Sequence, residues 1–425
     1  MLTEQQIQEI RQQIDFEFKR KSPPAGFPKF PDVPAGRYND PEFFELENKH
    51  YWRKTWMLAA TLDDIPNPGD YMLWEMARQP IVIVHGKDGE VRSFYNTCRH
   101  RGAPVVTEQR GHAEHGLVCN YHGWTYNHQG DLIGIRDKRD FIDFDFECRS
   151  LYPVRTERYG KLIFVNFDDE AMPLLQYLGP IADEWKEFQF DKLRLVDHYV
   201  WDLHCNWKIA IEANMEVYHV KSIHPQTVDP ALDYRGNVNT LYPHGHSRMV
   251  APNRVREKRG GYASTATHLP QIDTVGEIGR TCTQSYHVEP NWVSPLGSTL
   301  FPVLNFWPVN IRETKFELRW FAMDWGNGPV PAEWRQHIEW FNVVVTEDTQ
   351  FGDWIQKSVE SYAFKGVPLC YQEARIYHMH QNIDKMIGPN QVPAHLKVEP
   401  VLTDEWIHPN DTNERLRQQQ SLAAE

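Results

Sequence analysis

Polar and apolar residues follow two different periods along this chain. The first twenty residues predict a polar, amphipathic helix, and a Pro- and Gly-rich linker follows at 22–28. From about residue 51 to 168, short apolar runs alternate with turn sequences rich in Pro, Gly, Asn and Asp, which is typical of short strands. Ile81–Val84 is predicted to be a buried strand, and 162–167 to be the strand that closes this region.

The pattern beyond residue 168 has longer elements. It predicts helical structure at 173–190, strands near 194–205 and 313–325, and a long helix at about 331–361. Such a mixture is typical of an α+β fold in which helices pack on one face of an antiparallel sheet. We therefore expect three parts and a poorly ordered C-terminal tail: a helix with its linker at 1–50, a strand-rich domain at 51–168, and a larger mixed domain at 169–425.

The composition is that of a globular, acidic chain. Its 425 residues are 41% hydrophobic and carry a formal net charge of −13. Because no basic stripe offsets this charge, we expect no binding to nucleic acid. No apolar run approaches the length of a membrane span, the first helix lacks the apolar core of a signal peptide, and the cysteines suggest no disulfide framework. A cytoplasmic enzyme of two or three domains is therefore expected.

Two short pairs of Cys and His carry the strongest chemical signal. Cys98-Arg-His100 and Cys119-Asn-Tyr-His122 are separated by 18 residues, and each pair supplies one thiolate and one imidazole. This is the Rieske arrangement, in which two cysteines hold one iron of a [2Fe–2S] cluster and two histidines hold the other. A Cys2His2 zinc site is the rival interpretation, but zinc fingers usually place both cysteines in one pair and both histidines in the other.

A second group of candidate ligands lies further along the chain. In a helix, Glu212, Glu216 and His219 would share one side, and His224 at the helix end could fold back beside His219. Pro225 would end the helix directly after it. Two histidines and a carboxylate form the facial triad of non-haem Fe(II) oxygenases, which leaves coordination positions open for O2 and substrate. Taken alone, the same spacing also fits ordinary core or surface histidines.

Together, these motifs resemble the large (α) subunit of Rieske non-haem iron oxygenases, the ring-hydroxylating dioxygenase family. The resemblance extends to Asn206-Trp207-Lys208 and to an acidic stretch at 346–356. It implies an all-β domain whose two Cys/His pairs hold the Rieske [2Fe–2S] cluster. It also implies a helix-grip-like catalytic domain with an antiparallel sheet, on which the N-terminal helix and linker pack.

The same resemblance implies the ligands of a mononuclear Fe(II). They would be His219, His224 and an aspartate on a late helix. Asp348 matches that aspartate best, and Glu347 and Asp353 are the alternatives.

Glu216 would have a role in catalysis that depends on the oligomer. In similar proteins the equivalent carboxylate links a cluster histidine of one subunit to an iron-ligand histidine of the next, which implies a head-to-tail ring, most simply a homotrimer. The family usually has Asp at this position. Glutamate is found notably among oxygenases that resemble those attacking carnitine and betaine, so Glu216 weakens a naphthalene- or benzoate-like assignment without affecting the oxygenase chemistry.

The resemblance implies a terminal oxygenase that uses O2 and electrons from NAD(P)H. Because the chain has no G-x-G-x-x-G fingerprint, the electrons should come from a separate reductase, with or without a ferredoxin. We expect mono- or cis-dihydroxylation of an apolar cyclic compound, aromatic or steroid/terpenoid-like, as in aromatic hydrocarbon catabolism. Monooxygenation or demethylation of a quaternary amine is the alternative. A pure electron carrier is a third hypothesis, which the facial triad disfavours, and a small β subunit remains open.

Other residues suggest sites only weakly. His244 with His246, and His378 with His380, resemble metal ligands, but a His-x-His pair more often lines a pocket or a surface turn. Four aromatic residues either line an apolar pocket or pack in the core: Trp292, Phe301, Phe306 and Trp307.

Overall fold

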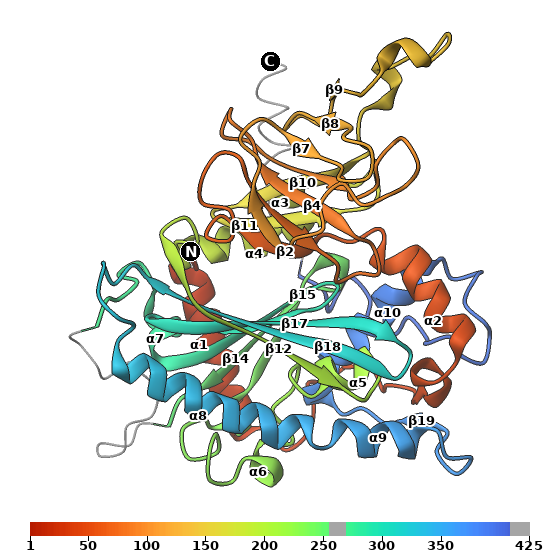
Figure 1. Cartoon of the computed structure of the whole chain (residues 1–425). Helices are drawn as coiled ribbons and strands as arrows, with labels where there is room; N and C mark the ends of the chain where they lie inside the picture. The colour runs from red at the N-terminus through yellow and green to blue at the C-terminus, as the bar shows by residue number, and fades with distance from the viewer. Residues whose placement is uncertain (255–268, 409–425) are drawn as a thin grey trace, which may run out of the picture. The chain divides into compact units, whose positions relative to one another are not determined.

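The computed structural model describes residues 1–254 and 269–408, which form two compact units (Figure 1). One unit comprises residues 53–174, and the other combines residues 1–52 with the described part of 175–425. Most of the tail that the sequence predicts to be poorly ordered lies outside the described residues. Both units contain antiparallel sheets, and the second also contains helices, so the expected α+β class is confirmed.

The unit of residues 53–174 is built on β-strands. A seven-stranded sheet has the order β2-β11-β10-β5-β4-β3-β6, a smaller one pairs β7, β8 and β9, and all pairs are antiparallel. The predicted strand at 81–84 is buried on both faces, as its unbroken apolar run requires. The strands are β2 (Met57–Thr61), β3 (Asp70–Trp74), β4 (Ile81–His85), β5 (Val91–Tyr95), β6 (Arg110–His112), β7 (Leu117–Val118), β8 (Thr125–Tyr126), β9 (Leu132–Gly134), β10 (Pro153–Tyr159) and β11 (Leu162–Asn166).

The other unit is built around a second seven-stranded antiparallel sheet, in the order β12-β18-β17-β16-β15-β14-β13. The inner strand β17 is buried on both faces except at its last two residues, so the sheet forms the core of this unit. A short pair, β1 with β19, lies apart from it. The strands are β1 (Val33–Pro34), β12 (Leu193–Leu203), β13 (Val238–Leu241), β14 (Ser247–Pro252), β15 (Cys282–Val288), β16 (Trp292–Leu296), β17 (Leu300–Asn310), β18 (Glu313–Met323) and β19 (Gly366–Val367).

Helices α8 and α9 run along one side of this sheet (Figure 1), and α5 packs against β17, β18 and α9. None of the described helices combines the length and the apolar character that crossing a membrane requires. The helices are α1 (Glu4–Lys19), α2 (Pro41–Glu47), α3 (Leu174–Leu178), α4 (Pro180–Glu184), α5 (Trp207–Glu212), α6 (Val220–Ile223), α7 (Glu277–Thr281), α8 (Ala332–Thr349), α9 (Gly352–Val359) and α10 (Ala374–Ile387), with a short 3-10 turn η1 at Ala35–Tyr38.

Two predicted helices are wrong in their extent. The helix predicted at 331–361 divides into α8 and α9 at Gln350 and Phe351. The helix predicted from Glu212 to His219 ends at Glu212, and further on the Glu216 carboxylate accepts the backbone N–H groups of the residues at 218 and 219. A continuous helix would have donated those groups to backbone carbonyls one turn earlier.

The four aromatic residues weighed as pocket lining are core residues. Trp292, Phe301, Phe306 and Trp307 belong to β16 and β17, and each is at most 2% exposed. The rings of Phe306 and Phe316 stack at 4.8 Å between centroids, which stabilises the contact between β17 and β18.

Candidate metal centres and substrate cavity

The two Cys/His pairs of the strand-rich unit lie in two turns of the same design. The backbone oxygen of Cys98 accepts the N–H of Gly102, and that of Cys119 accepts the N–H of Gly123. Both glycines have a positive φ, near 75° and 73°, which residues with a Cβ adopt only at a cost. The turns therefore depend on the glycine that follows each pair.

These turns bring the four side chains together. Cys98 and Cys119 are buried and free of disulfides, and the ring centroids of His100 and His122 are 4.5 Å apart. The buried Nδ1 of His100 has no hydrogen-bond partner among the described residues, whereas a buried ring nitrogen normally has one. Two thiols beside two imidazoles, one of them with an unpartnered nitrogen, fit the donor set of a Rieske cluster.

A second centre lies in the other unit, where α6 meets α8. One ligand atom from each of His219, His224 and Asp348 lies within 4.8 Å of the others. The Asp348 Oδ1 is 2.8 Å from Nε2 of His224 and 3.5 Å from Nε2 of His219. The structure thus gathers two imidazoles and one carboxylate from segments more than 120 positions apart.

The other ring nitrogens are held by further carboxylates. Nδ1 of His219 is 2.5 Å from Oε1 of Glu216, and Nδ1 of His224 is 2.7 Å from Oε2 of Glu347. Carboxylates in such positions set the tautomer of a ligating histidine, leaving Nε2 free to bind a metal. Asp353, one of the alternatives to Asp348, is instead paired with Lys357 on the surface of α9.

The electrostatics of this centre favour a cation. Burial lowers the pKa of His219, but the hydrogen bond and charge of Glu216, together with Asp348, raise it above its ordinary value overall. Burial likewise opposes protonation of His224, and Asp348 with Glu347 raises its pKa. The carboxylates that raise the pKa of both histidines stabilise positive charge at this position. A divalent metal ion bound to the two Nε2 atoms would supply that positive charge in place of protons.

An apolar cluster joins the two segments. Val217 and Val220 flank His219, and they pack in one buried cluster with Val344, which lies one turn before Asp348 on α8. This packing holds the histidine segment against the helix that carries the aspartate.

Comparison with known proteins decides the family. Residues 55–146 match the Rieske [2Fe-2S] domain, and residues 190–389 match the ring hydroxylating alpha subunit (catalytic domain). The carnitine monooxygenase oxygenase subunit of Escherichia coli (strain K12) is 31% identical over 343 residues, which are 79% of this chain and 86% of the relative. The chain belongs to the Rieske non-haem iron oxygenases.

Two further similarities describe this oxygenase. The 2-aminobenzenesulfonate 2,3-dioxygenase subunit alpha of an Alcaligenes species is 34% identical over 232 residues, 53% of this chain and 58% of the relative. The solved structure of a quaternary ammonium Rieske monooxygenase shares the fold, with a TM-score of 0.73 and 22% identity over 84% of this chain and 95% of that one. Family membership confirms the oxygenase class and its two cofactors, a Rieske cluster and a mononuclear iron, in place of zinc.

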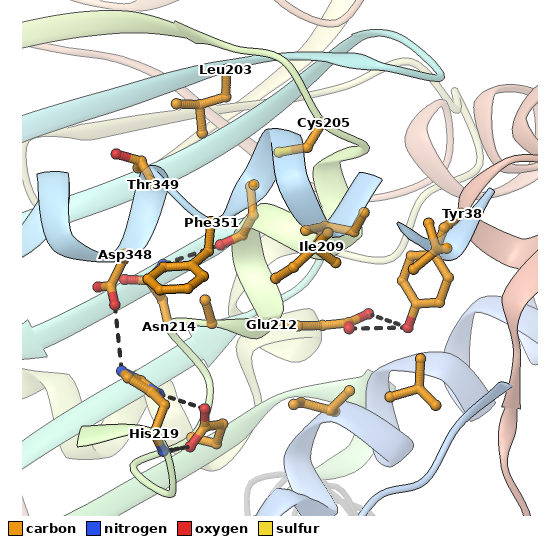
Figure 2. Close-up of a pocket in the computed structure, with 18 of the residues that line it drawn as sticks. Tyr38, Leu203, Cys205, Ile209, Glu212, Asn214, His219, Asp348, Thr349 and Phe351 are labelled. Carbon is orange, nitrogen blue, oxygen red and sulfur yellow. Dashed lines mark hydrogen bonds and ion pairs between the residues drawn. The ribbon is translucent and has the colours of Figure 1, made fainter. Parts of the chain in front are cut away.

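A cavity of about 360 Å³ opens beside the second centre of the oxygenase (Figure 2). His219 and Asp348 line one part of it, and Glu212 and Tyr38 line another. Most of the remaining wall is aliphatic or aromatic: Leu203, Ile209, Ala210, Ala213, Ile223, Phe351, Ile355, Val359, Phe364, Val367, Leu369 and Ile376. A small organic molecule can therefore lie next to the histidines and the aspartate.

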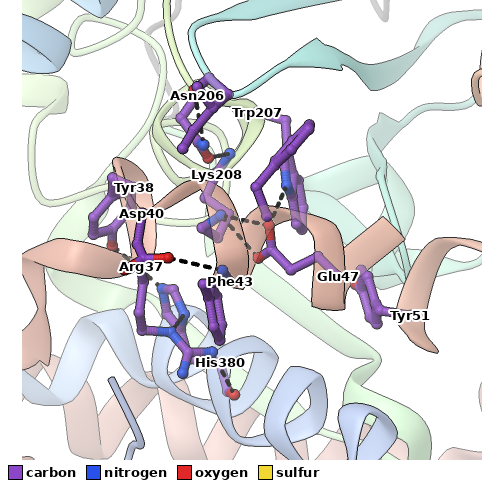
Figure 3. A network of polar contacts seen from close by, with 12 residues as sticks. Arg37, Tyr38, Asp40, Phe43, Glu47, Tyr51, Asn206, Trp207, Lys208 and His380 are labelled. Atoms are coloured by element: carbon purple, nitrogen blue, oxygen red, sulfur yellow. Dashed lines mark hydrogen bonds and ion pairs between the residues drawn. The ribbon is translucent and has the colours of Figure 1, made fainter. Parts of the chain in front are cut away.

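A buried polar network supports the wall of the cavity (Figure 3). Arg37 donates to Asp384 at 2.6 Å and, through Nε, to Nδ1 of His380 at 3.0 Å. Lys208 and Glu47 form a separate ion pair at 2.8 Å, with both side chains completely buried. Burial lowers the pKa of Lys208 and raises that of Glu47.

This network explains the Asn206-Trp207-Lys208 motif. The Asn206 side chain caps α5 by accepting the N–H of Lys208, and the Trp207 indole donates to the Glu47 carboxylate at 3.3 Å. The motif therefore starts and anchors the helix that ends at Glu212.

Tyr38 and His380 were not predicted to lie near the cavity. Tyr38 is separated from Glu212 by 174 positions, and no local pattern connects the two. The remaining histidine candidates have structural contacts: Nε2 of His246 is 2.8 Å from the backbone oxygen of Tyr177, and Nε2 of His378 is 2.7 Å from that of Tyr242.

Proposed function

We propose that this chain is the oxygenase component of a monooxygenase that acts on a quaternary amine. Its Rieske cluster would be held by Cys98, His100, Cys119 and His122, and its iron by His219, His224 and Asp348. A quaternary amine is the alternative substrate that the sequence suggests. It now becomes the main hypothesis, in place of the apolar cyclic compound.

The observation that carries this proposal is the chemistry of the cavity wall. The wall combines the carboxylate of Glu212 with aromatic side chains such as Tyr38 and Phe351, and the described residues that line it include neither Lys nor Arg. A permanent cation in an apolar pocket is favoured by carboxylates and by aromatic faces. The carnitine monooxygenase relative, which matches most of the chain, points to the same class.

When bound, the cluster and the iron supply electron transfer and O2 activation. The reaction would insert one oxygen atom of O2 into a C–H bond of the substrate and reduce the other to water, with two electrons from NAD(P)H and two protons. The protein orients the proposed iron ligands through hydrogen bonds. Glu216 accepts a hydrogen bond from Nδ1 of His219, and Glu347 accepts one from Nδ1 of His224. The apolar wall excludes water from the substrate.

We also propose that the chain forms a homotrimer and that a separate reductase supplies its electrons, with or without a ferredoxin. Within the chain, Oε2 of Glu216 accepts the backbone N–H groups of the residues at 218 and 219, and Oε1 accepts one hydrogen bond, from Nδ1 of His219. Oε1 therefore retains a lone pair for a cluster histidine of a neighbouring subunit. Inter-subunit electron transfer is described for the quaternary ammonium monooxygenase that shares the fold.

Turnover by the reconstituted system tests the substrate class. The purified oxygenase, a generic NAD(P)H reductase and a panel of quaternary amines, aromatic compounds and steroids would be compared by oxygen uptake and product analysis. We expect substrate-dependent oxygen uptake, with an oxygenated or demethylated product, only with quaternary amines. Product formation from aromatic compounds alone would overturn the proposal.

Aromatic dihydroxylation is the second candidate. It is favoured by the 34% identity to 2-aminobenzenesulfonate 2,3-dioxygenase over about half of the chain. In the same assay, aromatic dihydroxylation predicts that both atoms of ¹⁸O2 enter one ring product, whereas monooxygenation predicts that only one ¹⁸O atom enters the product.

A further inference from the structure

Glu212 is a carboxylate on the wall of an otherwise largely apolar cavity. It is the last residue of α5, and its side chain is 13% exposed. Figure 2 shows it extending toward Tyr38, on the far side of the cavity from Asp348. Glu212 therefore lies outside the group of iron ligands but faces the same cavity.

Two neutral donors fix the position of this carboxylate. The hydroxyl of Tyr38 donates to Glu212 at 3.0 Å. A guanidinium can only donate, so the bond from Arg37 makes Nδ1 of His380 an acceptor and places the proton of the neutral ring on Nε2. That Nε2 then donates to Glu212 at 2.9 Å. Burial, with the charges of Arg37 and Lys208, lowers the pKa of His380 well below its usual range and keeps the ring neutral.

No cation of the network contacts Glu212. Arg37 is paired with Asp384, and Lys208 is paired with Glu47. Glu212 is thus oriented by hydrogen bonds on its buried side and lacks a charged partner on the cavity side. Burial raises its pKa to about 8, against the hydrogen bond from Tyr38 and the charges of Lys208 and Arg37; the carboxylate of Glu373 acts in the same direction as burial.

The rest of the described cavity wall carries no Lys or Arg that could pair with an anion. Glu216 and Asp348 belong to the iron centre, and Glu373 accepts the backbone N–H of Cys370 at 2.7 Å. A substrate carboxylate would therefore meet carboxylates, apolar side chains and neutral polar groups such as those of Asn214 and Thr349, but no opposite charge, an arrangement that disfavours it.

We propose that Glu212 binds the cationic head of the substrate, and that the preferred substrate is a quaternary ammonium ion with an apolar body rather than a zwitterion. This inference rests on the proposed function and adds both a specificity-determining residue and a narrower substrate class. Tyr38 and His380 are positioning residues, which act by orienting Glu212.

The proposal predicts the pH dependence of binding. A quaternary ammonium ion keeps its charge at every pH, so it binds the ionised form of Glu212 and displaces its proton. Its affinity should therefore rise as the pH increases through about 8, the pKa of Glu212. A neutral ligand of the same shape should show no such increase.

Binding to the oxygenase loaded with cluster and iron tests the proposal by calorimetry. Choline is compared with its uncharged carbon isostere 3,3-dimethylbutan-1-ol, and butyltrimethylammonium with γ-butyrobetaine, in which a carboxylate replaces the terminal methyl group of the same cation. We expect each plain cation to bind more tightly than its counterpart. Glu212→Gln should weaken the binding of butyltrimethylammonium at least about 30-fold, as removing one partner of a buried charge pair does.

Glu373→Gln is the matched control, because it removes another carboxylate from the same wall. It should change the affinity for butyltrimethylammonium far less than Glu212→Gln does. Iron content and the visible spectrum of the cluster report whether each variant keeps both metal centres. The pH profile of the unmodified enzyme provides a test that needs no variant.

The outcomes separate this proposal from the function on which it rests. If no quaternary ammonium ion binds or is turned over, the proposed function fails. If such ions are turned over but Glu212→Gln binds them as the parent enzyme does, with a flat pH profile, the function stands and the role of Glu212 is wrong. Tighter binding of γ-butyrobetaine than of butyltrimethylammonium would overturn the preference for a plain cation.

Discussion

The two metal centres of this oxygenase are assembled in different ways. The four residues proposed to hold the cluster lie between positions 98 and 122, in two turns that each depend on a glycine with positive φ. The three proposed ligands of the mononuclear iron are His219, His224 and Asp348, and the aspartate lies more than 120 positions from the histidines, so no local turn brings them together. Helix α8 and a buried apolar cluster bring them together.

The contrast indicates which changes each centre can tolerate. A centre built from turns depends on local backbone geometry, and it should survive changes in distant packing. A centre built from distant segments depends on the core between them, and it should respond to a substitution that touches none of its ligands.

The largest effect is expected from removing a residue of the mononuclear centre. Asp348→Ala should abolish turnover and the binding of one iron per chain, while the visible and EPR spectra of the cluster persist, because the two centres share no ligand within the chain. Iron analysis and oxygen uptake measure this. Asp353→Ala is the control, and if it lost iron and activity while Asp348→Ala kept both, the choice of Asp348 would be wrong.

The converse experiment concerns the cluster. His100→Ala should remove the Rieske spectrum and the turnover driven by the reductase, since no electrons reach the iron. The mononuclear iron should remain, as measured by metal analysis. Loss of both metals in this variant would contradict the independence of the two centres.

A smaller effect is expected at Glu216, which touches His219 but is not placed among the ligands. Glu216→Gln should lower turnover roughly 10- to 100-fold, as the loss of such an outer partner does. Both metals and the proposed trimer should be retained, and Glu216→Asp should keep part of the activity despite its shorter reach. Undiminished turnover by Glu216→Gln, or full activity of a monomer, would refute the proposed route between subunits.

The smallest effect tests the packing argument. Val344→Ala removes two methyl groups from the buried cluster behind His219, and it should cost roughly 1–3 kcal/mol of stability. We expect weaker retention of the mononuclear iron during dialysis against a chelator, with an unchanged cluster spectrum. Val343→Ala, at a neighbouring position that is 51% exposed, is the control and should behave like the parent enzyme.

Local motifs determined much of what could be predicted. The Cys/His pairs predict the cluster because every donor lies within a short stretch whose turns the glycines themselves specify. An unbroken apolar run predicts the strand at 81–84, since a strand buried on both faces leaves a direct pattern in the chain. The spacing of His219 and His224 also suggests a metal centre, although the continuous helix assumed for it does not form.

Only the tertiary structure decided the rest. Packing of α8 against the histidine segment places Asp348 beside the two imidazoles and Glu347 beside Nδ1 of His224. Asp353 lies instead on the surface of α9. The fold also carries Tyr38 and His380 to Glu212, from positions far apart in the chain. A sequence pattern records how each residue meets its near neighbours, whereas the wall of a cavity is made by side chains whose encounter depends on how whole helices and strands pack.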